Sequence, residues 1–329
     1  MFGAWIQINN KTPRHSWDTL VCLALTLSAI AGLSSLPCNA QISTAPTSTA
    51  PTSTAPTSTA PTSTAPNSTA GPGTRPASKV YPLDGVVDQQ GGVWIVDRNA
   101  PGIWRFADGK IELAISGEKK FRQKLNAVRC IAISKEGELA AGDPATREVY
   151  RRNASGEWLP SVSGLIGIPM DLAFASDGTL YIADVERRVV WKQSTANEKP
   201  VVFSQANPRG LFVDSQDRLW VVSQDSTQLL RLSPDGKTEV SVGERVFEFP
   251  HQVVVDSQGV AWVTDGYKKG IWRIKENQPP ELVFSGEPFQ NPVGLFLYED
   301  QPVIVDPHAQ SVFKLVDGKP ELWFRIEVK

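Results

Sequence analysis

The chain has 329 residues, of which 41 % are hydrophobic and 21 % charged, and its formal net charge is −2. This slightly acidic balance excludes the basic surface on which nucleic-acid binding depends, so no nucleic-acid partner is expected. The average composition conceals three segments of different character.

Residues 1–40 have the pattern of a secretory signal peptide. A polar start that carries Lys11 and Arg14 precedes an apolar run at residues 20–33, and residues 38–40 (Cys-Asn-Ala) offer small side chains where a signal peptidase cleaves. The run is shorter than the roughly 20 residues that cross a bilayer, so we expect no transmembrane anchor in the mature chain. The protein is therefore expected to be secreted or to lie in the periplasm or cell envelope.

Residues 41–76 are predicted to be a disordered linker. Their central part repeats Ser-Thr-Ala-Pro-Thr and has no apolar residue larger than Ala or Pro, so it cannot bury enough surface to offset the entropy of ordering. Asn67-Ser-Thr is an N-glycosylation sequon, and Thr/Ser/Pro tracts resemble O-glycosylated stalks. Whether either modification occurs depends on the host.

Residues 77–329 contain an internal repeat. Strand-like apolar runs end at equivalent positions six times, at intervals of 39 to 46 residues, and seven residues after each endpoint a large apolar residue precedes a basic one, as in Trp104-Arg105 and Trp272-Arg273. Further strand-like runs come before and after, several of them introduced by Asp-Gly turns. The six endpoints are Asp97, Asp143, Asp184, Ser223, Asp265 and Asp306.

Four short strands per unit and a period near 42 residues are typical of a propeller blade. The sequence therefore predicts an all-β fold, a six-bladed β-propeller of four-stranded antiparallel blades, preceded by the signal peptide and the disordered linker. A helical solenoid is disfavoured because the apolar residues recur with period 2 and not 3.6. Cys130, the one cysteine left after the leader, lies in a strand-like run and is expected to be a buried structural residue.

A ligand site is expected around the axial opening of the propeller. In an antiparallel blade the start of the first strand and the end of the second lie at the same face. The Asp at the second-strand end recurs in five blades, which favours a structural duty in the following turn. Residues that break the repeat are more informative, because two arginines and a histidine at one mouth suit a carboxylate, a phosphate or an acidic sugar. The candidate ligand-binding residues are Arg129, Arg209, His251, Tyr267, Asp265, Asp306 and His308.

The blade pattern resembles a known superfamily. Pro-x-Gly-Leu-x-Val-Asp, Gly-x-Leu-Trp-Val-x-Asp and Ile-Trp-Arg are similar to motifs of NHL-repeat propellers and of the gluconolactonase/senescence-marker-protein group, over about residues 78–329. The resemblance implies the fold. It leaves the chemistry open, since related propellers are lactonases, lyases, strictosidine-synthase-like enzymes and protein-binding modules.

The resemblance also implies a divalent cation, calcium or zinc, held at the axis by Glu, Asn and Asp. Here the equivalent positions are Leu83, Arg129, Met170, Arg209, His251 and Val293. Asp84 and Asp171 stand one residue further on, where a regular strand points its side chains to the opposite face. No cofactor is therefore predicted, and calcium or zinc is expected only if the enzyme alternative holds.

A second, local resemblance concerns Phe249-Pro-His251 and Thr264-Asp-Gly-Tyr267, which are similar to segments of peptidylglycine α-amidating lyase. It implies that His251 is a zinc ligand and Tyr267 the catalytic base. A catalytic zinc site needs about three protein ligands, whereas the mature chain has only His251 and His308 as histidines. The count argues against this activity.

The sequence thus predicts an exported propeller, expected to be a monomer, that binds a small anionic ligand or a protein partner at its axial face. The alternative is a gluconolactonase-like metal-dependent hydrolase, or a lyase, with a non-standard site. Whether the protein is an enzyme stays open.

Overall fold

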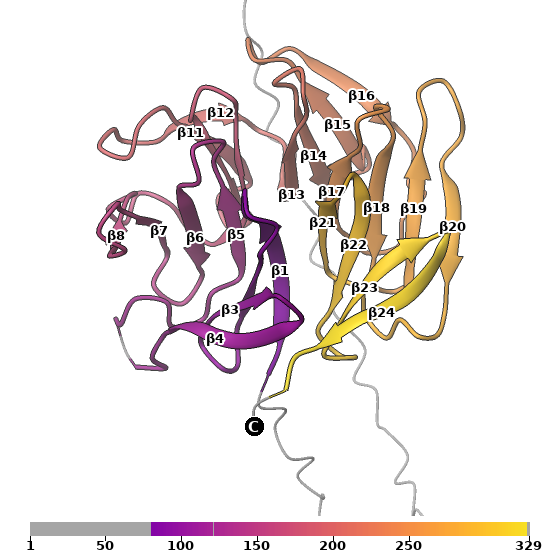
Figure 1. Ribbon diagram of the computed structural model, residues 1–329. Helices are drawn as coiled ribbons and strands as arrows, with labels where there is room; N and C mark the ends of the chain where they lie inside the picture. Colours follow the sequence, from indigo (N-terminus) through magenta and orange to yellow (C-terminus); the bar gives the residue numbers. More distant parts are fainter. Residues whose placement is uncertain (1–79, 121, 328–329) are drawn as a thin grey trace, which may run out of the picture. The chain divides into compact units, whose positions relative to one another are not determined.

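The structure, a computed structural model, describes residues 80–120 and 122–327. Within these residues the chain forms 24 strands and no helix, arranged as six four-stranded antiparallel sheets, each built from four consecutive strands. The prediction of a six-bladed β-propeller is confirmed (Figure 1). The predicted leader, residues 1–40, and the predicted linker, residues 41–76, lie outside the described residues.

The strands of each blade run outward from the axis. The first, innermost strands are β1 (Pro82–Val87), β5 (Cys130–Ile133), β9 (Pro169–Phe174), β13 (Pro208–Val213), β17 (Pro250–Val255) and β21 (Gly294–Tyr298). The second strands are β2 (Val93–Asp97), β6 (Leu139–Asp143), β10 (Leu180–Asp184), β14 (Leu219–Ser223), β18 (Ala261–Asp265) and β22 (Gln301–Asp306). The third strands are β3 (Gly102–Ala107), β7 (Glu148–Arg152), β11 (Val189–Gln193), β15 (Leu229–Leu232), β19 (Gly270–Ile274) and β23 (Ser311–Val316). The outer strands are β4 (Lys110–Ser116), β8 (Trp158–Pro160), β12 (Val201–Ser204), β16 (Thr238–Val242), β20 (Glu281–Ser285) and β24 (Lys319–Arg325).

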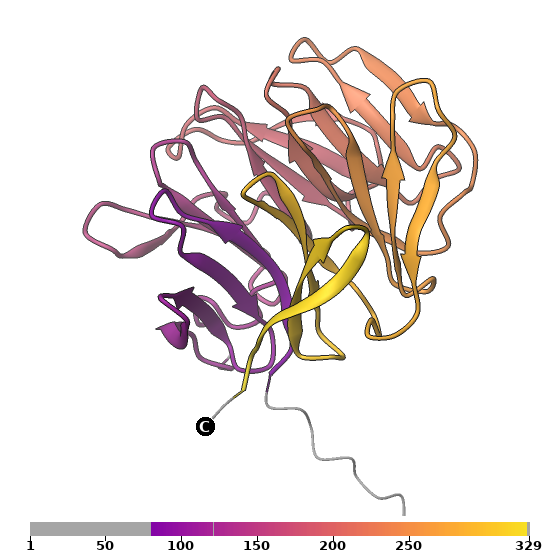
Figure 2. The ribbon, with the colours of Figure 1, turned by 45° about the vertical axis from the view of Figure 1, so that its right-hand side comes forward.

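The ring closes without a strand shared between its ends. Each innermost strand contacts the next around the axis, and β21 contacts β1 (Figures 1 and 2). Among the described residues, β24 completes blade six beside β23. Val80 and Ile326 lie in one buried cluster between blades one and six, and Phe106 stacks on Phe324 with ring centroids 4.1 Å apart. Apolar packing therefore joins the two ends of the ring.

Hydrophobic packing between blades forms the core. Six clusters of buried side chains occupy the six junctions, each drawing mainly on two neighbouring blades. The large residues of the third strands take part, since Trp104, Tyr150, Trp272 and Phe313 are all buried. These residues recur in the sequence because each junction between blades buries a large side chain at the same place. Cys130 is buried as expected, with 1 % of its surface exposed.

Local sequence accounts for the turns and the strand ends. Asp108-Gly109 and Asp317-Gly318 all adopt the left-handed conformation that tight hairpins between twisted strands require. The Asp at the end of a second strand accepts backbone N–H groups on both sides of it; Asp97, for example, bonds Tyr81, Asn99 and Ala100. This Asp therefore fixes the entry to its own blade and the turn that follows.

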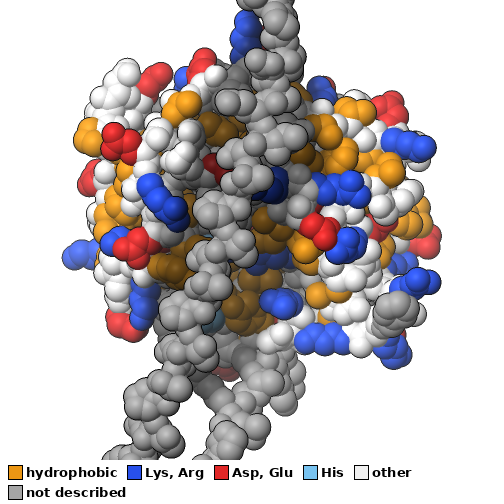
Figure 3. Space-filling model, turned by 180° about the vertical axis from the view of Figure 1, so that it is seen from behind, with side chains coloured by type: hydrophobic (Ala, Val, Ile, Leu, Met, Phe, Trp, Pro, Cys, Tyr) orange, Lys and Arg blue, Asp and Glu red, His pale blue; other side chains and the backbone are white. Residues whose placement is uncertain are grey.

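The surface mixes both signs of charge. Figure 3 shows acidic and basic side chains interleaved around the circumference of one face, with hydrophobic side chains toward the middle. None of the described residues belongs to a helix that could span a bilayer.

Candidate functional site

The innermost strands begin with an irregularity that shapes the axis. The pairing register of β1 with β2 shifts between Pro82 and Asp84, and β9, β13 and β17 have the same kind of shift near their starts. A bulge rotates a strand locally, so two consecutive side chains can face the same side. Leu83 and Asp84 accordingly both border a narrow cavity of about 10 Å³ on the axis, as do Met170 and Asp171. The expectation that Asp84 and Asp171 face away from the other axial residues is therefore wrong.

A larger cavity of about 530 Å³ opens where the innermost strands begin; we call it the axial cavity. It lies at the face predicted from the blade pattern. Arg129, Arg209 and His251 all line it, together with Arg98, which is exposed. Four blades thus bring three guanidinium groups and an imidazole to one opening.

Arg209 is held in one orientation by aromatic neighbours. Its Cζ lies 4.1 Å from the centre of the Phe249 ring, and its Nε and Nη2 lie 3.3 and 3.2 Å from Nδ1 of His251. Phe249 also contacts the His251 ring edge-on and stacks on Tyr267 at 4.6 Å. A planar guanidinium fixed in this way presents its remaining N–H groups with little loss of entropy on binding.

The contact with Arg209 sets the protonation of His251. A guanidinium can only donate, so Nδ1 of His251 accepts, and a neutral ring then carries its proton on Nε2. Burial, followed by the charges of Arg209 and Arg129, holds the pKa of His251 well below its usual range. The Nε2 atom is buried without a partner in the described part of the chain. His251 is therefore a neutral donor and not a poised base.

Burial weakens the proton affinity of the two arginines without removing their charge. It lowers the pKa of Arg209 to about 10, with Arg129 contributing by repulsion, and it also lowers the pKa of Arg129. Within residues 80–120 and 122–327, neither arginine has a carboxylate oxygen within the 4.0 Å of an ion pair. The positive charge of the axial cavity is therefore only partly compensated, by the Asp84 and Asp171 carboxyl groups that attract Arg129 from below.

Below the axial cavity, three side chains from alternate blades cross-link the innermost strands; we call them the axial clasp. Asp84 accepts the N–H of Ile131 at 2.9 Å, Asp171 that of Leu211 at 2.6 Å, and Gln252 that of Leu295 at 2.9 Å. In each case the side chain bonds the innermost strand of the following blade. The Gln252 amide also donates to Asp84 at 2.9 Å and to Asp171 at 3.2 Å, which joins the three.

The equivalent positions in the other three blades hold small residues. Cys130, Gly210 and Gly294 stand there, and a Cβ on Gly210 or Gly294 lies 2.6 Å from a backbone oxygen of the next blade. The clasp therefore needs an alternation of a long polar residue and a small one around the ring.

The clasp carboxylates are unusually hard to ionise. Burial raises the pKa of Asp84 to about 6, despite hydrogen bonds from Ile131 and Gln252. Burial and the nearby Asp84 raise the pKa of Asp171 well above its usual range. Two carboxyl groups this close to one buried amide are expected to share one proton near neutral pH.

The donor set at the axis does not fit a divalent cation. The oxygens of Asp84, Asp171 and Gln252 already accept N–H groups, including those of Gly85 and Leu172, and the positive charge of Arg129 acts on both carboxylates. Within the described ranges, no group of three His, Cys, Asp or Glu side chains is arranged to hold a metal ion. Calcium needs six to eight free oxygen ligands, which this arrangement cannot supply.

The remaining sequence-predicted residues lie apart from the cavity wall. Tyr267 is 69 % exposed and reaches the wall only through Phe249. His308 is exposed and its Nε2 lies 3.3 Å from the hydroxyl of Tyr81, which lines the cavity. Asp265 and Asp306 are fully buried and accept backbone N–H groups at the blade entries. The structure thus brings together Arg129, Arg209 and His251, and places the other four around them or beneath the surface.

Sequence reasoning missed Phe249, Asn291 and Gln252. Phe249 and Asn291 precede an innermost strand and line the cavity. A sequence signal was available, since Phe249 stands two residues before His251, and Asn291 two residues before the equivalent Val293. The role of Gln252 depends on contacts across three blades, which no local pattern records.

The opposite end of the axis holds a separate apolar cavity of about 310 Å³. It is lined by later residues of the same innermost strands, among them Val86, Phe174, Phe212 and Leu297, and reaches Asp84 and Gln252 at its base. The narrow cavity of about 10 Å³ lies between the two. That space is close to one water molecule, so the clasp separates the two faces.

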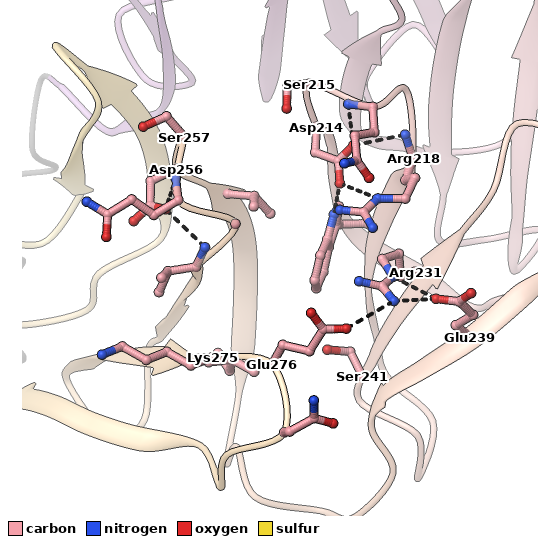
Figure 4. Close-up of a pocket in the computed structure, with 18 of the residues that line it drawn as sticks. Asp214, Ser215, Arg218, Arg231, Glu239, Ser241, Asp256, Ser257, Lys275 and Glu276 are labelled. Atoms are coloured by element: carbon pink, nitrogen blue, oxygen red, sulfur yellow. Dashed lines mark hydrogen bonds and ion pairs between the residues drawn. The ribbon is translucent and has the colours of Figure 1, made fainter.

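Another cavity lies away from the axis, between blades four and five; we call it the interblade groove. It measures about 760 Å³. Figure 4 shows its arginines among carboxylates: Arg231 lies between Glu239 and Glu276, and Arg218 donates to Asp214 at 2.8 Å. The charges of these arginines are compensated within the groove.

Fold and site together define a six-bladed propeller with a cationic pocket at one end of a blocked axis. Residues 73–247, more than half of the chain, match the family model described as the SMP-30/Gluconolactonase/LRE-like region. The chain belongs to this family, which confirms the resemblance seen in the blade motifs.

Solved structures share the fold at low sequence identity. Virginiamycin B lyase from Staphylococcus aureus aligns with a TM-score of 0.57 at 17 % identity, over 77 % of this chain and 87 % of that one. The gluconolactonase XC5397 from Xanthomonas campestris aligns with a TM-score of 0.58 at 14 % identity, over 70 % and 84 %. A chain of a nidogen/laminin complex aligns with a TM-score of 0.58 at 14 % identity, over 68 % and 89 %. No curated protein sequence matches the chain.

Proposed function

We propose that the protein is an exported binding propeller that takes a small anionic ligand, a carboxylate, into the axial cavity. The observation that carries the proposal is the pair Arg129 and Arg209, which line one cavity and form no ion pair with any carboxylate among the described residues. Charge-assisted hydrogen bonds to a carboxylate contribute about 1.5–3 kcal/mol each. A carboxylate that hydrogen-bonds both guanidinium groups is therefore expected to bind here with a favourable free energy.

The protonation of His251 supports a binding role over acid–base catalysis. A catalytic base needs a pKa near the working pH and a free lone pair. His251 has its Nδ1 lone pair engaged by Arg209 and its pKa held low by burial. The imidazole serves instead to orient Arg209.

A hydrolase remains the second candidate, favoured by the family to which the chain belongs. Family membership supports the class of reaction, whereas the donor set around Asp84 and Asp171 counts against a metal-dependent form of it. The same cavity could also bind a protein partner that presents an acidic side chain to it.

The test is calorimetric titration of the protein with acetate and phenylacetate. We expect the double variant Arg129→Ala/Arg209→Ala to bind at least about 100-fold more weakly than the wild type. Arg231→Ala, in the interblade groove, is the matched control and should bind like the wild type. Circular dichroism shows whether the double variant keeps its fold. The single variant Arg209→Ala is a second test, because it keeps the charge of Arg129 next to the buried carboxyl groups of the clasp. If both axial variants bind carboxylates as well as the wild type does, the proposal fails.

A further inference from the structure

The walls of the axial cavity also contain apolar side chains. Between the cationic groups lie Leu83, Ile168, Met170, Phe249 and Val293. Ile168, Met170 and Phe249 are only half-buried, so part of each side chain faces the opening. The charged end of a ligand therefore meets the arginines while the rest of it meets a hydrocarbon surface.

Hydrogen-bond acceptors are scarce on the same walls. The side-chain acceptors in the part of the lining that the structure describes are the Tyr81 hydroxyl, the Asn291 amide and Nδ1 of His251, and the last is engaged by Arg209. Neither Asp nor Glu stands among these lining residues. The arginines can donate to a hydroxyl oxygen, but a buried O–H that finds no acceptor costs about 1–3 kcal/mol, so a polyhydroxylated acid is a poor match.

The interblade groove has the hydrogen-bond acceptors that the walls of the axial cavity lack. It offers carboxylates, amides and hydroxyls together, among them Glu276, Gln258 and Ser241. The axial cavity has a different composition from a groove of similar size on the same molecule. The difference points to a different class of ligand.

Resting on the proposed function, we infer that the ligand is a monocarboxylate with an apolar body, a branched aliphatic or aromatic acid, held by Arg129 and Arg209 at its carboxylate and by Ile168, Met170 and Phe249 along its hydrocarbon. A cavity of about 530 Å³ suits a small molecule of this kind. Arg209 stacked on Phe249 places the charged and apolar surfaces side by side, so one ligand can satisfy both.

A homologous series of acids tests the inference by calorimetric titration. Acetate, butanoate, hexanoate, phenylacetate and gluconate are titrated into the full chain. We expect affinity to rise about threefold to fourfold per methylene from acetate to hexanoate, because each buried methylene contributes a roughly constant free energy. Gluconate, which has the same number of carbons as hexanoate, is expected to bind no better than acetate.

Variants of the apolar wall locate the effect. Met170→Ser and Ile168→Ser should each reduce the ratio of hexanoate to acetate affinity by about threefold or more, whereas Val240→Ser, at an exposed position of the interblade groove, should leave the ratio unchanged. A flat series, or gluconate binding more tightly than hexanoate, overturns the apolar-acid inference while leaving the anion site in place. Failure of every acid to bind the wild type overturns the proposed function itself.

Discussion

The axial cavity and the interblade groove both contain two or more arginines, yet their electrostatics differ. In the groove, Arg218 and Arg231 are paired with carboxylates of the same or the next blade. In the axial cavity, Arg129 and Arg209 have no such partner in the described chain, and a stacked aromatic ring and a neutral imidazole hold Arg209 in place. The number of basic residues therefore says little about where an anion binds; the compensation of their charge decides it.

The largest expected effect concerns the clasp beneath the axial cavity. Gln252→Ala removes an amide that bridges Asp84 and Asp171 and accepts the N–H of Leu295. Leaving these buried groups unpaired should lower the free energy of unfolding by about 3 kcal/mol, which corresponds to a fall in Tm of roughly 6–12 °C. Differential scanning calorimetry measures it.

The matched control for the clasp is Gln258→Ala in the interblade groove. Gln258 is exposed, so its loss should change the free energy of unfolding by less than about 0.5 kcal/mol. Equal shifts for the two glutamines show that the clasp does not hold the blades together.

The second prediction tests whether the planar shape of the guanidinium group, and not only its charge, matters in the axial cavity. Arg209→Lys keeps the charge but loses the planar group that lies on Phe249 and donates twice to His251. We expect carboxylate affinity to fall about tenfold, since a lysine cannot present a fixed pair of donors. Arg231→Lys should leave it unchanged, and calorimetric titration of phenylacetate distinguishes the two; a wild-type affinity for Arg209→Lys means that charge alone is recognised.

The third prediction concerns pH. Because the pKa of Asp84 is raised to about 6 in the folded state from 3.8, the folded protein binds more protons than the unfolded chain between these values. Its stability should therefore fall as pH rises through this window, by up to about 1.4 kcal/mol per pH unit for one proton. Asp171, whose pKa is also raised, acts in the same direction. Urea denaturation at several pH values from 4.5 to 6.0 gives the slope.

In Asp84→Asn this part of the slope should be lost. The remaining slope in this variant reports Asp171, whose pKa is still raised by burial but no longer by the charge of Asp84. Asp214→Asn in the groove is the control. The pKa of Asp214 is lowered, mainly by hydrogen bonds from Trp220 and Arg218 that outweigh its burial, so its titration falls below the window and the slope should not change. A wild-type slope in Asp84→Asn contradicts the assignment.

The smallest expected effect is that of metal ions. The clasp oxygens are engaged by N–H groups, so calcium, zinc or a chelator should leave Tm unchanged in thermal unfolding. A site filled at 100 times its dissociation constant stabilises by about 2.7 kcal/mol, which is readily measured. An increase in Tm that corresponds to this stabilisation, with either metal, would favour the metal-dependent hydrolase.

How much the sequence could predict depended on whether a feature repeats. The endpoints Asp97 to Asp306 recur in nearly every blade, and the second strands end at those residues in the structure. Arg129, Arg209 and His251 could be placed at one mouth because blade symmetry equates their positions. Their binding role stays a prediction.

Features that depart from regular strand geometry could not be predicted from the sequence. Asp84 and Asp171 were expected on the opposite face because a regular strand alternates its side chains, and the bulge that turns them to the axis leaves no local signature. Phe249 precedes β17, and its contact with Arg209 joins two blades 40 residues apart. Such contacts depend on the closed ring and not on any segment of it.

The blocked axis also has a kinetic consequence. Because the clasp leaves only about 10 Å³ between the two faces, a ligand that enters the axial cavity must leave by the same opening. A bulky residue placed at that rim away from the arginines, for instance at the exposed Ala145, would slow association and dissociation by the same factor. Residence time could then be lengthened while the equilibrium constant stays fixed, which a passage open at both ends would not allow.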